Sequence, residues 1–277
     1  MKKIKTFILG IGAQKAGTSW LHQYINNDQR ANLGQMKEYH YWNSIFVESE
    51  NYKNKKQKKL LSKPVHTLNN DELLRRTMLI NPQYYPVYFN SIINSGFSIT
   101  GDITPQYSRS NEYGFKYIQK TLEAVGFNIK IIYLIRDPVE RLWSNIRMEK
   151  KLSPSTKGGV SDSDAFKSLL ENKQWRGIDS RYEVTIKRVK DVFKSENIYI
   201  GIYEEMFTSS KLKELSDFIG IDYNPEMIEK RINASEKKEE IDLGILIKAR
   251  EFYKITYEFC YDNFPQTKHL WKQKAYG

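Results

Sequence analysis

Cysteine is almost absent from this sequence of 277 residues, which contains only Cys260. A single cysteine cannot form an internal disulfide, so nothing in the sequence requires an oxidising compartment. Cys260 lies in an apolar helical pattern, where we expect a buried thiol. No apolar run approaches the length of a membrane span, and we therefore predict that no helix crosses a membrane.

Linkers and metal-binding patterns are missing as well. No segment rich in proline, glycine and serine divides the chain, and we predict one domain over residues 1–277. His22, His66 and His269 have no carboxylate or cysteine partners at metal-ligand spacing, which predicts that there is no metal site.

The charge balance is strongly basic, with a formal net charge of +11 and a pI near 9.3. Such a charge suits anionic ligands, either as the donor or as the acceptor of a transferred chemical group. Zinc-finger spacing and aromatic RNA-binding signatures are absent, so we do not expect a nucleic-acid partner. Lysines before residues 6–13 imitate a signal peptide, but the apolar run is short and continues into a glycine-rich loop. We interpret it as a strand and expect a cytoplasmic, bacterial or bacterial-like protein.

Apolar strand patterns alternate with amphipathic helix patterns along the chain. This order predicts an α/β fold with a P-loop-like parallel sheet and helices on both faces. Ligands of such folds bind at the carboxyl ends of the strands. The expected strands are 6–11, Phe97–Ile103, Ile129–Ile135 and Ile198–Tyr203, and the expected helices are Thr18–Asn26, Tyr113–Ala124, Pro138–Lys151, Arg181–Phe193, Lys211–Ile219 and Leu243–Tyr261.

The segment Phe7–Leu21 has the pattern of a buried strand, a glycine-bounded turn and a helix start. Glycines at 12 and 17 allow backbone N–H groups to converge on an anion, and the helix adds the positive end of its dipole. Nucleoside-triphosphate loops place lysine directly after the second glycine, whereas Thr18 stands there and the lysine is Lys15. This displacement disfavours a P-loop kinase, which remains the alternative enzyme.

Two segments together resemble the sulfotransferases that use 3′-phosphoadenosine 5′-phosphosulfate (PAPS). The first segment, Gln14–Leu21, is similar to their 5′-phosphosulfate loop. The second, Ile131–Ser144, is similar to their strand-turn-helix that binds the 3′-phosphate, with Arg136 and Ser144 in the matching positions. The resemblance implies transfer of a sulfuryl group from PAPS, with adenosine 3′,5′-bisphosphate (PAP) as product. It implies donor binding by Gln14, Lys15, Ala16, Gly17, Thr18, Ser19, Trp20, Arg136 and Ser144.

A third segment, Lys37–Trp42, resembles K-E-x-H-[FY]-[FW] of the glycosaminoglycan-type (heparan sulfate) sulfotransferases and their bacterial relatives. In that family the glutamate is the acceptor base, which implies this role for Glu38. His40 is either a hydrogen-bonding residue of the active site or an orienting core histidine. Asn43 departs from the aspartate that some members carry, so acceptor contacts made there by relatives do not transfer.

Two further segments extend the same resemblance. Gly101–Tyr107 is similar to [GE]-[ED]-K-T-P-x-Y, although Ile103 replaces a lysine of some members. Arg176–Tyr182 is similar to a donor-binding segment, which implies that Tyr182 contacts the donor.

The implied reaction assigns a role to each group. Glu38 removes the acceptor proton, while Lys15, the N–H groups of Ala16–Ser19 and the helix dipole neutralise the leaving phosphate. Arg136 and Ser144 orient the donor, and the leaving PAP requires no metal. We expect the aromatic neighbours of Glu38 to raise its pKa, and we take His40 and Asp102 as the next candidates for the base.

The acceptor is expected to be a hydroxyl, or less favourably an amine, of a saccharide or similar metabolite. A binding module that keeps only the donor pocket is the non-enzymatic alternative. Lys53–Lys63, which holds six lysines and no acid, is interpreted as a solvated helix face or a loop that guides an anionic acceptor. Ser153–Ser163 is interpreted as a surface loop or lid, and the aromatic group around Tyr85 as core. The sequence does not specify an oligomeric state.

Overall fold

A computed structural model of the chain describes residues 4–46, 57–152, 160–172, 177–230 and 242–272. In this part, four parallel strands form one sheet in the order β2-β1-β3-β4. The predicted parallel α/β fold is therefore confirmed, with strand limits that differ from the expected ones by one or two residues. The strands are β1 (Lys5–Gly12), β2 (Ile99–Ile103), β3 (Phe127–Ile135) and β4 (Ile198–Ile202).

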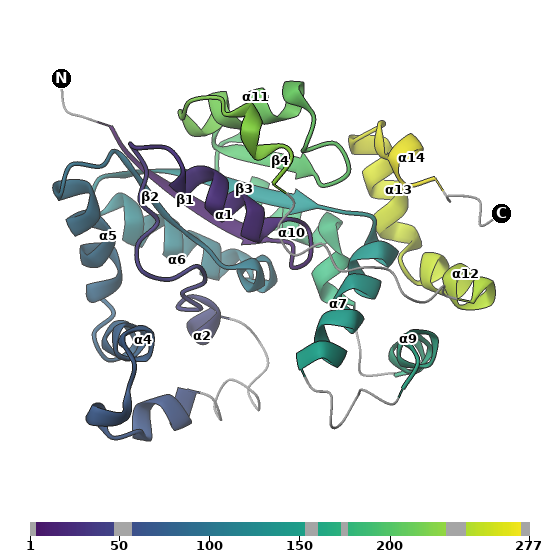
Figure 1. Ribbon diagram of the computed structural model, residues 1–277, viewed down its shortest axis with the longest axis horizontal. Helices are drawn as coiled ribbons and strands as arrows, with labels where there is room; N and C mark the ends of the chain where they lie inside the picture. Colours follow the sequence, from purple (N-terminus) through teal and green to yellow (C-terminus); the bar gives the residue numbers. More distant parts are fainter. Residues whose placement is uncertain (1–3, 47–56, 153–159, 173–176, 231–241, 273–277) are drawn as a thin grey trace.

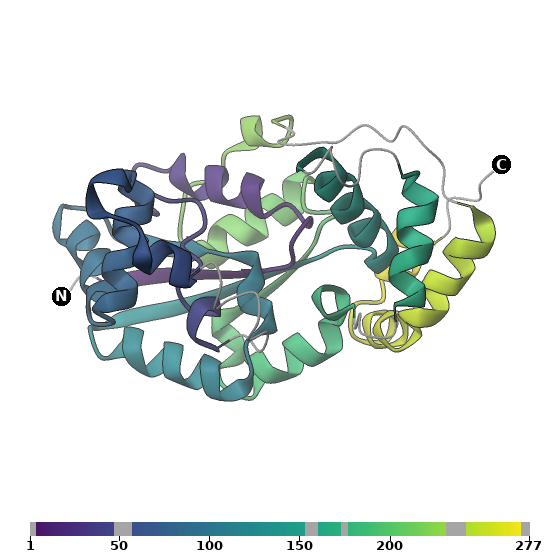
Figure 2. The same ribbon diagram turned by 90° about the horizontal axis from the view of Figure 1, so that it is seen from below.

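Helices cover both faces of this sheet, with α1 on one side and α6 and α10 on the other (Figure 2). Because the central strands are covered on both faces, their sequences are almost continuously apolar, as in β1 and the second half of β3. The helices are α1 (Thr18–Asn26), α2 (Asn43–Phe46), α4 (Asn70–Ile80), α5 (Tyr84–Asn94), α6 (Glu112–Glu123), α7 (Pro138–Leu152), α9 (Asp162–Glu171), α10 (Tyr182–Lys190), α11 (Ser209–Ile219), α12 (Leu243–Phe252), α13 (Lys254–Asn263) and α14 (Thr267–Leu270).

The loops after β1 and β3 leave the sheet at the same edge, where parallel strands end. The Ala13 N–H donates to the Leu134 carbonyl over 2.6 Å, which joins the loop after β1 to the end of β3. Helices α7, α9, α12 and α13 gather beyond this edge, while α4 and α5 lie toward the other end of the molecule (Figure 1). The candidate site lies at this carboxyl edge.

Two of the expected elements differ from the structure. The prediction of one continuous helix over Leu243–Tyr261 is wrong, because the chain bends at the buried Tyr253, which separates α12 from α13. Each half packs on a different partner, α12 on α7 and α9 and α13 on α10, which one straight helix would not reach. The loop Ser153–Ser163 is wrong at its end, where the Ser161 side chain caps α9; residues 153–159 lie outside the described part.

The expected buried side chains are confirmed in part, because Tyr84 and Tyr88 of the aromatic group are only half-buried against the core. Tyr85 and Phe89 are fully buried and pack against the ring of Phe7 on β1. Cys260 is a buried free thiol on α13. Helix α4, which the sequence analysis did not anticipate, begins with a reciprocal cap between Asn69 and Glu72, and this spacing is a readable helix-start signal.

Candidate active site

The loop between β1 and α1 has the backbone shape of an anion cradle. Lys15 and Gly17 both have left-handed backbone angles, with φ of 69° and 92°. A Cβ on Gly17 would lie 3.1 Å from the Met206 sulfur, so both the conformation and the space favour glycine. In the described residues, no protein acceptor binds the N–H groups of Gly17, Thr18 and Ser19 at the start of α1. These N–H groups and the helix dipole are available to an anion.

Ala16 departs from its expected role. Its N–H donates to the Ala13 carbonyl over 3.1 Å, inside the loop, and its side chain is fully buried. Ala16 therefore fixes the shape of the cradle, and the exposed N–H donors begin one residue later.

Two arginines from the β3–α7 segment hold the loop from outside. Arg136 Nη1 donates to the Lys15 carbonyl over 3.1 Å, and Arg141 Nη1 donates to the Gln14 carbonyl over 3.4 Å. Arg141 is almost fully buried and also binds the Ser180 hydroxyl. Arg141 is a site residue that no motif in the sequence indicated. The sequence feature that could have indicated Arg141 is its position five residues after Arg136, one turn into α7 and on the buried face of that helix.

Arg136 keeps a free donor despite these contacts. Its guanidinium lies 4.6 Å from the centre of the Tyr203 ring and 3.5 Å from the Glu140 carboxylate. Its Nε is buried and has no hydrogen-bond partner in the described residues. A buried, unpaired donor is costly, so this arginine fits an anionic ligand. Ser144 lies two turns into α7 and is buried at 5% exposure.

Two predicted donor-binding side chains face the interior. Tyr182 is fully buried, and its hydroxyl donates to the Arg136 carbonyl over 2.7 Å. The Trp20 indole N–H donates to the Met227 carbonyl over 2.8 Å, and its ring stacks on Tyr24. Tyr182 therefore supports the backbone of Arg136, and Trp20 anchors α1.

The charges around Lys15 are concentrated and of one sign. Burial lowers the pKa of the Lys15 ammonium, and the neighbouring Arg136, Arg147, Lys37 and Arg141 lower it further. Like charges repel, and this repulsion is relieved when an anion with several negative charges binds to the cluster.

Glu38 lies between two nitrogen donors. Its carboxylate is 2.6 Å from Lys37 Nζ and 3.2 Å from His40 Nε2, and its side chain is 25% exposed. Burial raises the pKa of Glu38, but hydrogen bonds from His40 and Lys37 outweigh burial and hold that pKa at about 2. The prediction that aromatic neighbours raise this pKa is therefore wrong, because direct donors contact the carboxylate.

The segment that carries His40 is fixed by a buried carboxylate on β2. Asp102 accepts hydrogen bonds from the hydroxyls of Thr104, Tyr107 and Tyr85 at 2.7, 2.5 and 2.9 Å. The Thr104 and Tyr107 hydroxyls in turn accept the backbone N–H groups of His40 and of the next residue, at 3.3 and 3.1 Å. Asp102 is fully buried, and burial raises its pKa. The prediction that Asp102 is a further candidate for the base is therefore wrong, because no acceptor can reach its buried carboxylate.

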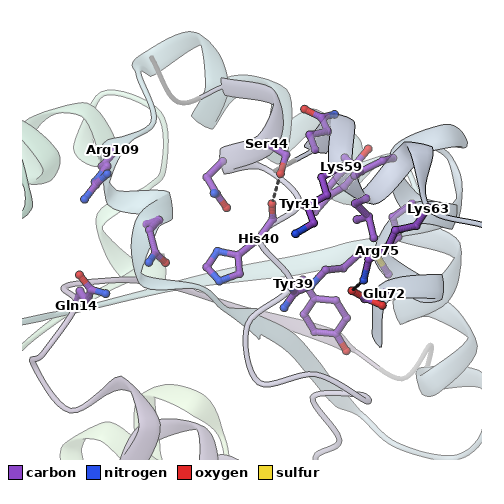
Figure 3. A pocket seen from close by; sticks show the side chains of 16 residues that line it. Gln14, Tyr39, His40, Tyr41, Ser44, Lys59, Lys63, Glu72, Arg75 and Arg109 are labelled. Atoms are coloured by element: carbon purple, nitrogen blue, oxygen red, sulfur yellow. Dashed lines mark hydrogen bonds and ion pairs between the residues drawn. The ribbon is translucent and has the colours of Figure 1, made fainter. Parts of the chain in front are cut away.

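A cavity of about 710 Å³ adjoins both parts of the site. Figure 3 shows Gln14 of the anion loop on one side and His40 near the centre, with basic side chains of α4 and of the segment before it on the other side. The cavity lining also includes Tyr39 and Tyr41 but not Trp42, so two of the three aromatic residues around Glu38 contribute to its wall. The cavity is therefore lined both by Gln14 of the anion loop and by His40, which contacts the Glu38 carboxylate.

The remaining histidines do not gather with metal ligands. In the described ranges, no group of three or more histidine, cysteine, aspartate or glutamate side chains lies at one place. His22 lies close enough to Lys37 and Glu38 for both charges to act on it; burial is the main cause that lowers its pKa, to about 4.

The family comparison agrees with this geometry. Residues 5–240 match the family model described as the sulfotransferase domain. The chain belongs to the sulfotransferase family. Members of this family transfer sulfuryl groups. The match therefore disagrees with the alternative hypothesis of a P-loop kinase. No curated protein sequence matches the chain significantly, and the closeness to the heparan sulfate branch stays a prediction.

A solved structure shares the fold of this sulfotransferase, and two others resemble it more weakly. A sulfotransferase from Alicyclobacillus acidocaldarius is 16% identical, with a TM-score of 0.59, over 94% of this chain and 96% of that one. A Mycobacterium avium sulfotransferase is 12% identical, with a TM-score of 0.49, over 95% of this chain and 78% of the other. A mouse sulfotransferase complexed with PAP is 13% identical, with a TM-score of 0.48, over 100% and 90%. Among the described residues of the present chain, no helix is long and apolar enough to cross a membrane.

Proposed function

We propose that this sulfotransferase transfers the sulfuryl group of PAPS to a hydroxyl, or less favourably an amine, of a saccharide or similar metabolite. The observation that carries the proposal is the cavity that joins Gln14 of the anion loop to His40, the direct partner of Glu38. An acceptor in this cavity would lie between the proposed base and the proposed donor cradle.

The donor residues fit a nucleotide that carries anions at two ends. The free N–H groups at the start of α1, together with Lys15, suit the 5′-phosphosulfate. Arg136, whose buried Nε lacks a protein partner, suits the 3′-phosphate together with Ser144. PAPS supplies an activated sulfuryl group on a phosphate leaving group. In this assignment Lys15 and the α1 N–H groups stabilise the negative charge that develops on that phosphate.

Glu38 is assigned as the base and His40 as the residue that holds it. With a pKa of about 2, Glu38 is ionised at neutral pH and ready to accept a proton. His40 Nε2 contacts the Glu38 carboxylate at 3.2 Å, and the backbone of His40 is left-handed, with φ of 56°. His40 itself lines the cavity, so this contact links the carboxylate to the cavity wall. The whole chain, including helices α12–α14 beyond the family match, is proposed to form one domain, because α12 packs on α7 and α9 and α13 packs on α10.

The proposal is tested by transfer of labelled sulfuryl from PAPS to metabolites of the host extract. Glu38→Gln keeps the side-chain shape and should lose about a hundredfold or more in transfer, while PAP affinity stays normal. Lys15→Ala should fold normally and lose turnover more than donor affinity, because its charge matters most in the transition state. His40→Ala should cost less than Glu38→Gln.

The control is Glu123→Gln on the exposed end of α6, which should leave transfer unchanged. No labelled product from a folded protein that binds PAP would favour the donor-binding module instead. Near-normal transfer by Glu38→Gln would contradict the assignment of the base.

A further inference from the structure

The cationic side chains of the cavity differ in whether a carboxylate already neutralises them. Arg109 makes two hydrogen bonds with Asp179, at 2.6 and 2.7 Å, and Lys63 is 2.5 Å from Glu72. These two cations are satisfied within the protein. The cavity lining contains two more cations, and their situation is different.

Arg75 and Lys59 form no ion pair within the described ranges. Arg75 Nη2 donates to the Glu38 backbone carbonyl over 2.7 Å, but its Nε is buried and has no hydrogen-bond partner there. Glu72, which also lies on α4 and lines the cavity, pairs with Lys63. Lys59 is exposed on the helical turn before α4 and lines the same cavity. A guanidinium with a buried, unpaired donor needs an anionic or strongly polar acceptor.

Neutral polar atoms complete this cavity wall. Asn43 Oδ1 and Gln106 Oε1 are buried and lack hydrogen-bond partners in the described residues, and both residues line the cavity. Amide side chains can satisfy hydroxyl groups as donors or as acceptors. The wall therefore combines groups that suit hydroxyls with a cationic end that suits an anion.

We propose that Arg75, assisted by Lys59, binds an anionic group of the acceptor, so that the preferred acceptor is a hydroxylated acid rather than a neutral alcohol. This inference rests on the proposed function, because it takes the cavity as the acceptor site. The same guanidinium holds the Glu38 carbonyl, so recognition of the anion and placement of the base depend on one side chain. Carboxylate, sulfate and phosphate share the required chemistry.

The experiment measures dissociation constants by NMR titration of the PAP-saturated protein with matched probes. The probes are methyl β-D-glucoside, which is neutral, methyl β-D-glucuronide, which carries a carboxylate, and glucose 6-sulfate. PAP occupies the donor anion site, so the added probes report on the cavity. We expect at least one anionic probe to bind about tenfold or more tightly than the glucoside, the scale of one charge-assisted contact.

Three variants test which residues cause the preference for the anionic probes over the neutral glucoside. Arg75→Gln should abolish it, and Lys59→Gln, an exposed change that does not threaten the fold, should reduce it. Lys63→Gln should retain it, because Glu72 already neutralises that lysine. All three should bind PAP like the unmodified protein.

Two results would overturn the inference: no anion preference, including no measurable probe binding, in a protein that binds PAP, or a preference that survives Arg75→Gln. Failure of the proposed function has a different signature, since the unmodified protein would then either not bind PAP or bind PAP and transfer no labelled sulfuryl group. The glucuronide and the sulfate distinguish which anion the site prefers.

Discussion

Glu38 owes its electrostatic state to two contacts, those of Lys37 and His40. Because these donors stabilise the charged carboxylate, the pKa stays low although burial opposes it. A base of this kind is always ionised near neutral pH, but it holds a proton weakly. Its contribution to catalysis therefore depends on position more than on basicity, which makes the exact neighbours of Glu38 decisive.

Replacing Lys37 tests this account of the base. Lys37→Met removes one hydrogen bond and one positive charge, so the pKa of Glu38 should rise from about 2. Protonation of Glu38 would then reduce transfer at a higher pH than in the unmodified protein, and the acid limb of kcat/KM should move upward in pH. Lys116→Met, which breaks an exposed pair on α6, is the control. An unchanged acid limb in Lys37→Met would show that the lysine does not set the state of the base.

At the scale of elements, the end of β2 holds the segment that carries Glu38, the proposed base. Asp102 reaches the backbone of His40 through the Thr104 hydroxyl, which accepts one hydrogen bond and donates another. His40 has a left-handed backbone conformation that non-glycine residues rarely adopt. The network holds this conformation, so the strand that follows the first crossover supports the catalytic segment across the site.

Thr104→Val should disturb this support without reaching the donor loop. The change keeps the side-chain shape but leaves the His40 N–H and one Asp102 oxygen unpaired, at a cost of about 1–3 kcal/mol in the free energy of unfolding. Transfer should also fall while PAP affinity stays constant. Thr104→Ser restores the hydroxyl and should recover both properties. Urea unfolding and transfer assays measure the two effects, and full activity in Thr104→Val would exclude the positioning role.

The sequence predicted the strands and the glycine-bounded loop after the first strand, because both depend on local pattern. Apolar runs define buried strands, and glycines at 12 and 17 define the turn. The partners of these residues were harder to predict. Arg141 on the Gln14 carbonyl, Tyr182 behind Arg136 and Arg75 on Glu38 all join residues that are far apart in the chain. Periodicity carries no information on such pairings.

At the scale of the whole molecule, the C-terminal helices are tied to the carboxyl edge of the sheet. Glu204, just after β4, accepts the Asp137 N–H over 3.0 Å and the Trp271 indole N–H over 2.8 Å. Burial raises the pKa of Glu204 to about 7. This link joins the ends of β3, β4 and α14, and the sequence did not predict it because its residues are far apart in the chain.

The buried Glu204 predicts how stability depends on pH. Its pKa in the folded protein is higher than the ordinary 4.5, so between pH 4.5 and 7 the folded state binds more protons than the unfolded state. Stability should therefore decrease as pH rises through this range, by on the order of 3 kcal/mol from this group. Glu204→Gln removes the titration, so the difference between variant and unmodified protein in denaturant unfolding should change between pH 4 and 8. A constant difference would contradict the assignment.

The central claim is that the α1 cradle and Arg136 bind a donor with phosphates at both ends. Calorimetry that compares PAP with adenosine 5′-monophosphate tests it most directly, because the two ligands differ in the 3′-phosphate. The account predicts that PAP binds roughly ten- to a hundredfold more tightly, the value of one charge-assisted contact of about 1.5–3 kcal/mol. Equal affinity for the two nucleotides, or a preference for ATP with magnesium, would contradict it.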